Sequence, residues 1–231
     1  MAGSAAASGA AQDRSLFAVV FLVRPNPERL DEYLGIAGDL RPRLAGEPGF
    51  IENGRFRSRS DPGTLLSISL WDDEKSLVRW RTAGPHHDAQ VRGRAGVLAA
   101  YGIRVGEVAE AWGRHADGRA LGWMRHDETG AGDARALVLL DGAAPPGSAL
   151  AELAEQFSGR AGSGAFEADV FDHLQGGDRV ALLTAWRTIG EARAFGRVAA
   201  PRVGKDGSVL VIRVIRTYGM DDRVEAPQFF G

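Results

Sequence analysis

The order of predicted elements repeats once along the chain, and this repeat constrains the fold more than any other feature of the sequence. Alternating or continuous apolar runs predict strands, and apolar residues at helical spacing predict helices. In the first half we expect a strand at 16–23, a helix at 30–44, strands at 50–59 and 64–71, a helix ending at Trp80, a helical stretch at 86–100 and a strand at 101–112. In the second half we expect a strand at 136–140, a helix at 146–159, strands at 165–173 and 179–186, a helix at 189–199 and a strand at 208–218. Both halves therefore follow the order β-α-β-β-α-β.

Aromatic residues occupy matching places in the two halves. Phe50 precedes Trp71 by 21 residues, and Phe166 precedes Trp186 by 20. Each Trp ends the third expected strand of its half. Nine residues further on, Trp80 in the first half matches Phe195 in the second. These matches indicate two copies of one structural unit.

A four-stranded sheet with both helices on one face leaves its other face bare, and an apolar bare face must be covered. A second copy is the obvious cover. We therefore predict an α+β fold of two tandem ferredoxin-like βαββαβ modules, which together form within one chain the α/β barrel that other proteins form by dimerising. Each module is expected to keep a cavity between its helices and its sheet. The expected boundaries are a disordered leader (1–14), a first module (15–112), a linker (113–133), a second module (134–220) and a tail (221–231).

The composition of the chain excludes several classes of function. The net charge is -2 and the basic residues are scattered, so we expect no nucleic-acid partner. No apolar run approaches the ~18–20 residues of a membrane span. Cys is absent, which rules out thiolate sites and fits a reducing, cytoplasmic location. Neither a phosphate-binding glycine loop nor a nucleophile elbow is present, so we expect no tightly held nucleotide cofactor.

The first half resembles the antibiotic biosynthesis monooxygenase family of dimeric α/β barrels. The similarity lies in Glu47-Pro48-Gly49-Phe50, the hairpin from Phe56 to Trp71, Ser69 to Glu74, Trp80, Gly84 to Gln90, Gly93-Arg94 and Tyr101 to Val105. The tandem layout is similar to oxygenases of aromatic polyketide pathways, including fused enzymes that open a ring of angucycline intermediates. The second half matches mainly through Phe166, Trp186 and its hairpin.

This resemblance implies an oxygenase that acts, with O2 and without a metal, on a polycyclic aromatic polyketide intermediate in antibiotic biosynthesis. It also implies reduced flavin (FADH2 or FMNH2) as a diffusible cosubstrate and a flavin reductase as a partner, with the chain a monomer or a homodimer. Two other classes of function stay open, a cofactor-free polyketide cyclase or isomerase and a non-catalytic protein that binds an aromatic ligand. Haem-degrading relatives carry a ligating His where this chain has Gln90 and Lys205, which argues against haem.

The resemblance also implies the residues of a substrate pocket. Trp71, at the end of a strand, would stack on an aromatic ring, with Trp186 in the equivalent role and Trp80 nearby. Relatives carry an Asn four residues before the strand-end Trp, and this chain has Ser67 there instead. Ser67 shares a strand face with Trp71 and could hold a substrate oxygen, or it could be small only to leave space.

Further candidates follow from the types of residue. His86 and His87 are candidate catalytic bases, because imidazole titrates near neutral pH, although a solvent-facing pair is the simpler interpretation. Tyr33 lies on the apolar face of the first helix, where it could belong to the core or its hydroxyl could reach the pocket. Asn53 and Arg55 alternate on one strand face, which indicates either a solvated edge or an electropositive rim for an anionic substrate or a flavin phosphate. No metal ligand set is expected.

Overall fold

The structure is a computed structural model that describes residues 16–116, 133–158, 165–224 and 226–227. Its eight described strands close into one barrel in the order β1-β3-β2-β6-β7-β5-β8-β4, with antiparallel neighbours throughout. The strands are β1 (Phe17–Pro25), β2 (Phe50–Ser58), β3 (Leu65–Trp71), β4 (Leu98–Gly113), β5 (Ala136–Ala143), β6 (Glu167–His173), β7 (Arg179–Trp186) and β8 (Ser208–Gly219). The predicted α+β barrel is confirmed.

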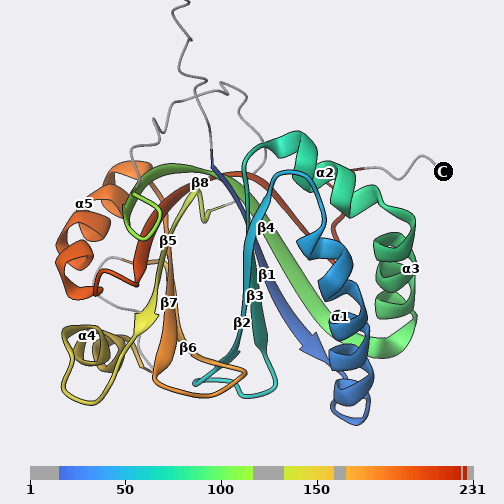
Figure 1. Cartoon of the computed structure of the whole chain (residues 1–231), viewed down its shortest axis with the longest axis horizontal. Helices are drawn as coiled ribbons and strands as arrows, with labels where there is room; N and C mark the ends of the chain where they lie inside the picture. The colour runs from blue at the N-terminus through green and yellow to red at the C-terminus, as the bar shows by residue number, and fades with distance from the viewer. Residues whose placement is uncertain (1–15, 117–132, 159–164, 225, 228–231) are drawn as a thin grey trace, which may run out of the picture.

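Helices cover the barrel on two opposite sides, as Figure 1 shows. On the side of the N-terminal half lie α1 (Leu30–Ala45), α2 (Glu74–Thr82) and α3 (Gly84–Arg92), and on the other side lie α4 (Ala149–Phe157) and α5 (Ile189–Ala199). One-turn segments are η1 (Pro27–Arg29), η2 (Gly93–Val97) and η3 (Ala200–Arg202). Among the described residues no helix is long and apolar enough to cross a membrane.

Strand alternation gives the barrel an apolar interior and an outer face for the helices. In β3, Leu66, Ile68 and Leu70 belong to the interior core. Because successive side chains of a strand point to opposite faces, Ser67, Ser69 and Trp71 point outward, beneath the helices. The same core contains residues of both halves, among them Leu137 and Leu210, so each sheet covers the bare face of the other.

Two seams join the halves. The β4–β8 seam is long and runs from the pair Gly102–Gly219 to the pair Gly113–Ser208. The β2–β6 seam is short and joins Phe56–Ser58 to Phe171–His173. The long seam brings the end of β8, from the second half, to the edge of the first half's sheet.

Local sequence explains how α2 is placed at the end of β3. The side chain of Asp73 caps the helix by accepting from the backbone N–H of Ser76 at 2.8 Å. Gly49 has φ of +81°, and a Cβ there would collide with the Ser76 side chain, so only glycine fits this turn. The Gly49 carbonyl accepts from the backbone N–H of Asp72 at 2.8 Å, which ties the start of β2 to the start of α2.

Some predicted element boundaries were wrong. The helical stretch expected at 86–100 ends at Arg92, because Gly96 adopts φ of +112° and the chain turns into β4 at Leu98. The helix expected at 146–159 spans only Ala149–Phe157, because the side chain of Ser148 caps its start. The leader at 1–14 lies outside the described residues, as does most of the 113–133 linker, and the 221–231 tail is described only in part.

Candidate functional site

A cavity of about 200 Å³ lies between the outer face of the N-terminal sheet and helices α1 to α3. Aromatic and aliphatic side chains make up most of its wall, with a few polar groups. The lining residues are Val19, Phe21, Tyr33, Ile36, Ala37, Leu40, Leu44, Asn53, Arg55, Ser67, Ser69, Trp71, Leu77, Trp80, Arg81, His86, Ala89, Gln90, Gly93, Arg94, Val97, Leu98, Tyr101, Ile103, Val105 and Tyr218. A largely apolar cavity with a few convergent polar groups is typical of a small-molecule site.

The floor of the cavity changes from apolar to polar across the sheet. Strand register places Ile103, Phe21, Ser67 and Arg55 in one row from β4 to β2. The next row consists of Val105, Val19, Ser69 and Asn53. A ligand lying along these rows would meet apolar side chains over β4 and β1 and polar side chains over β3 and β2.

The two N-terminal tryptophans form part of the wall. The Trp71 indole N–H donates to the Ser69 hydroxyl at 2.9 Å, and its ring meets Phe50 edge-on at 5.5 Å between centroids. Trp80 stacks on His86 with ring centroids 4.6 Å apart. Both tryptophans therefore line the cavity as the sequence suggested, and the indole N–H of Trp71 already has an acceptor within the protein.

The adjacent histidines occupy different environments. Burial lowers the pKa of His86 to about 4, so its imidazole is neutral at pH 7. Its Nδ1 lies 3.0 Å from the Trp80 carbonyl oxygen, so this nitrogen carries the proton and leaves Nε2 as an acceptor. His86 lines the cavity and His87 does not, because neighbouring residues on a helix point in different directions.

An amide from the neighbouring strand reaches Ser67, the position at which the family resemblance implies an Asn. The Asn53 Nδ2 donates to the Ser67 hydroxyl at 3.1 Å and to the Ile68 carbonyl at 2.7 Å. Asn53 and Ser67 thus form one polar group in the cavity wall. Because Ser67 accepts this hydrogen bond, its own hydroxyl proton is available to donate.

Arg55 lies in the cavity wall and not on a solvated edge. Its Nη2 donates to the Ala37 carbonyl at 3.1 Å, and its buried Nε has no hydrogen-bond partner among the described residues. Burial lowers the pKa of Arg55 and raises that of the buried Tyr33 hydroxyl, which also lines the cavity. The edge interpretation was therefore wrong for Arg55, because α1 covers this end of β2.

Two residues of the cavity wall, Arg81 and Tyr218, were not predicted from the sequence. Arg81 of α2 donates to the side-chain oxygen of Gln90 and lies over the Tyr218 ring, 5.2 Å from its centroid. Tyr218 comes from β8 of the second half and reaches the cavity because it pairs with Ile103 across the long seam. No local pattern in the sequence shows this pairing.

In the part of the C-terminal half that the structure describes, apolar side chains pack into the equivalent space. Trp186 is buried in a core with α4 and α5 and lies away from the cavity. Its ring lies 5.2 Å from that of Phe195, which in turn meets Phe157 at 5.5 Å. The expected second cavity is therefore a packed core, because apolar side chains occupy the positions that are polar in the first half. The structure does not bring Trp186 to the candidate site.

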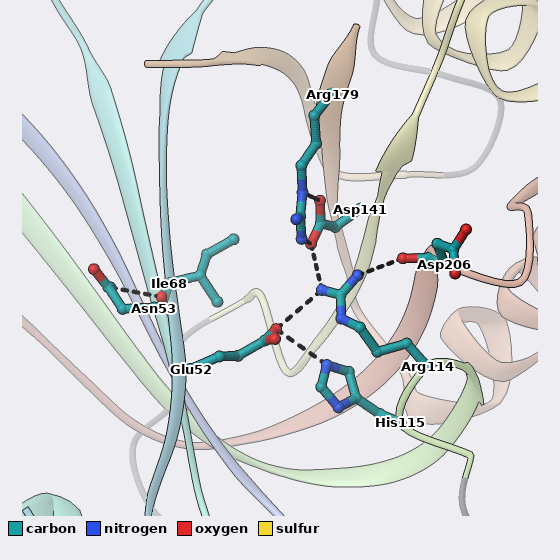
Figure 2. A network of polar contacts seen from close by, with 8 residues as sticks. All are labelled: Glu52, Asn53, Ile68, Arg114, His115, Asp141, Arg179 and Asp206. Atoms are coloured by element: carbon teal, nitrogen blue, oxygen red, sulfur yellow. Dashed lines mark hydrogen bonds and ion pairs between the residues drawn. The ribbon is translucent and has the colours of Figure 1, made fainter. Parts of the chain in front are cut away.

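A second polar cluster lies at one mouth of the barrel and has its charges paired, as Figure 2 shows. Arg114 bridges Glu52 at 3.0 Å and Asp141 at 2.7 Å, and Arg179 also binds Asp141. His115 Nε2 lies 3.0 Å from the Glu52 carboxylate. Although burial opposes the shift, His115 and Arg114 lower the pKa of Glu52 to about 2. Because Glu52 and Asp141 each have cationic partners from the other half or from the segment after β4, this cluster ties the two halves together.

No three His, Asp or Glu side chains gather to form a metal site within the part of the chain that the structure describes. No Asp or Glu is found among the described residues that line the cavity. Its titratable groups are arginines, tyrosines and His86, a set better suited to an organic or anionic ligand than to a metal ion.

Comparisons with known proteins agree with this architecture. The sequence profile described as antibiotic biosynthesis monooxygenase matches residues 16–92. The chain is 38% identical over 224 residues to a "Jasmonate monooxygenase ABM" of Pyricularia oryzae, a match that covers 93% of this chain and 98% of that protein.

Two solved structures are also similar. An aldoxime dehydratase in complex with butyraldoxime is 11% identical, with a TM-score of 0.56, over 90% of this chain and 81% of that one. An anthrone oxidase-like protein is 14% identical, with a TM-score of 0.37, over 93% and 97% of the two chains. The first of these supports the fold alone. Identity to the Pyricularia protein over nearly the whole of both chains decides the family. The chain belongs to the antibiotic biosynthesis monooxygenase family and is an oxidoreductase of the monooxygenase type.

Proposed function

We propose that this monooxygenase oxidises a small, largely apolar compound bound in the N-terminal cavity, and that jasmonate or a close analogue is its substrate. The observation that carries the proposal is the 38% identity to a protein named jasmonate monooxygenase over 98% of that protein's length. The cavity supports it, because its mixed apolar and polar floor suits a compound with an apolar body and a polar end.

The electron balance leaves two forms of the reaction. Hydroxylation of a C–H bond uses one O2 and two external electrons with two protons, and it gives the alcohol and water. In this form reduced flavin is the proposed electron donor. Conversion of a CH2 group to a carbonyl by one O2 gives water as the second product and draws all its electrons from the substrate, so no reductant is needed.

The residues of the cavity are proposed to orient the substrate and exclude water from it. Trp71 and Trp80 supply flat apolar walls, and Asn53 with Ser67 supplies a polar contact. His86 stays a candidate for contact with the reacting group through Nε2. With a pKa of about 4 it is a weak base, so its proposed role is that of a neutral hydrogen-bond acceptor.

A polycyclic aromatic polyketide is the second candidate substrate. The aromatic wall favours it, because Trp71, Trp80, Tyr101 and Phe21 offer faces and edges to fused rings. Under this alternative an electron-rich phenol is oxidised, and His86 and Tyr33 lie where they would meet its oxygens.

The test measures oxygen uptake and product mass for the purified chain with jasmonate, with an anthrone and with an angucycline-type phenol. Each compound is assayed with and without a flavin reductase, NADH and flavin. A jasmonate product 16 mass units heavier, formed only with the reductase system, supports the hydroxylase form with flavin as donor. If the anthrone is turned over and jasmonate is not, the polyketide candidate replaces jasmonate as the proposed substrate. Loss of substrate without oxygen uptake would instead indicate the cyclase or isomerase.

A further inference from the structure

The cavity contains positive charge without a matching negative charge. Arg55, Arg81 and Arg94 line it, and among the described residues none of them forms an ion pair with a carboxylate. The Nε atoms of Arg55 and Arg81 are buried and have no hydrogen-bond partner among the described residues. A guanidinium group stays charged at any pH a protein tolerates, so an unpaired one in an apolar wall costs stability.

Arg55 has fewer contacts than Arg81 and a more polar setting. Among the described residues, the hydrogen-bond acceptor of the Arg55 guanidinium is the Ala37 backbone carbonyl. Arg81 has the side-chain oxygen of Gln90 and the ring of Tyr218. Arg55 also pairs in register with Ser67, whose hydroxyl lies on the same face of the sheet. The two arginines lie over opposite edges of the floor, with Arg55 at the polar edge.

The arginines of the polar cluster at the barrel mouth are paired with carboxylates. Arg114 and Arg179 are each held by Asp141, and Arg114 also by Glu52. Arg104, Arg213 and Arg216 likewise have carboxylate partners. Arg57 and Arg187 also have no carboxylate partner among the described residues, but they lie outside the cavity. Arg55 differs because it lies in the cavity wall without such a partner, which indicates that its partner is a ligand.

We propose that Arg55 binds a carboxylate group of the substrate, with the Ser67 hydroxyl as a second donor. The apolar body of the substrate then lies over Phe21 and Ile103, toward Trp71 and Trp80. This inference deepens the proposed function and rests on its assignment of the cavity as the substrate site. A charge-assisted contact in this setting makes a carboxylate bind about 10- to 100-fold tighter than its neutral ester.

The test measures binding without turnover, under nitrogen and with no reductant. The probes are jasmonate, 2-naphthoate and the methyl ester of each, titrated against the full chain by calorimetry. The variants are Arg55→Gln, Arg55→Lys and the matched control Arg81→Gln, each compared with the parent chain by circular dichroism and urea unfolding. At least one acid should bind the parent chain at least tenfold tighter than its ester. Arg55→Gln should reduce that preference to within about twofold, while Arg55→Lys and Arg81→Gln should retain most of it.

Several results would overturn the assignment. Equal binding of acid and ester by the parent chain would do so, as would failure of both acids to bind at 5 mM. If Arg81→Gln loses the preference for acid over ester and Arg55→Gln keeps it, the carboxylate binds at Arg81, over the other edge of the floor. If Arg55→Gln fails to fold, Arg55→Lys and Arg81→Gln decide between the two positions. Because no oxygen is consumed in this experiment, an acid preference without turnover would support Arg55 even if the proposed oxidation of jasmonate fails.

Discussion

The two halves of the barrel share a scaffold and differ in what lies beneath their helices. In each half a tryptophan ends the third strand and donates its indole N–H to the hydroxyl two residues earlier. Trp71 donates to Ser69 at 2.9 Å, and Trp186 donates to Thr184 at 2.9 Å. The strand order is also the same, β4-β1-β3-β2 in one half and β8-β5-β7-β6 in the other.

Matched positions of the two floors differ in polarity. Arg55 pairs with Ser67 in the first half, and Val170 pairs with Leu182 at the corresponding place in the second. One pair further along the strands, Asn53 corresponds to Ala168. The second half thus has apolar side chains at the places where the first half has an Arg, a Ser and an Asn.

The helices also pack differently on the sheet in the two halves. In the second half α5 lies close to β8, where a Cβ at Gly196 would fall 2.7 Å from the Val211 side chain. In the first half helices α1 to α3 and the sheet enclose the cavity. One copy of the repeat has the features of a binding site, while the other closes the barrel and contributes Tyr218 to that site.

Exchanging matched floor residues between the halves should have the largest effect on stability. Val170→Arg should lower the free energy of unfolding by about 3–5 kcal/mol or more, because it places an unpaired charge in a packed core. The matched change Arg55→Val should cost much less, since it removes an unpaired charge from a cavity wall. Urea unfolding of both variants measures the difference. Equal losses would show that the first half is packed as tightly as the second.

The second prediction concerns the pH dependence of folding stability, to which His86 of the first half should contribute. The pKa of His86 is about 4 in the folded chain and about 6.5 when unfolded, so between these values only the unfolded chain takes up the proton. Stability should therefore fall by about 3 kcal/mol as the pH drops from 6.5 to 4, in addition to the contributions of other groups. Unfolding curves for the parent chain, His86→Gln and the control His87→Gln test this. Only His86→Gln should lose that part of the pH dependence.

Filling the cavity should make the first half resemble the second. Ser67→Leu introduces the residue found at the matched position, Leu182, and should weaken binding of jasmonate at least tenfold, about 1.4 kcal/mol, with the fold retained. Ser67→Ala keeps the space open but removes the hydroxyl that is the proposed second donor, so it should weaken binding less than Ser67→Leu does. Calorimetric titration measures both. Unchanged binding in Ser67→Leu would place the ligand elsewhere.

The smallest expected effect is spectroscopic. A ligand in the cavity should quench the fluorescence of Trp71 and Trp80 and leave that of Trp186 unchanged. Trp186→Phe should therefore keep the quenching and bind within about twofold of the parent chain, whereas Trp80→Phe should lose part of the quenching. Loss of quenching in Trp186→Phe would contradict the assignment of the site to the first half.

Local patterns in the sequence were enough to predict the fold and much of the cavity wall. Apolar periodicity and the matched tryptophans were enough to predict a doubled module and a barrel, because these signals are local and occur twice. Trp71, Trp80, Ser67, Tyr33, Asn53 and His86 were all predicted, and all line the cavity. Their roles in binding or catalysis stay predictions.

Packing between distant elements determines which half encloses a cavity and which charged groups lack a partner among the described residues. The repeat made Trp71 and Trp186 look equivalent, and the difference between them depends on residues of neighbouring strands. Whether Arg55 meets solvent, a carboxylate or a cavity depends on how α1 crosses β2, and Tyr218 reaches the site only through the pairing of β4 with β8. Such contacts join residues that are distant in sequence, so the local spacing of residues does not predict them.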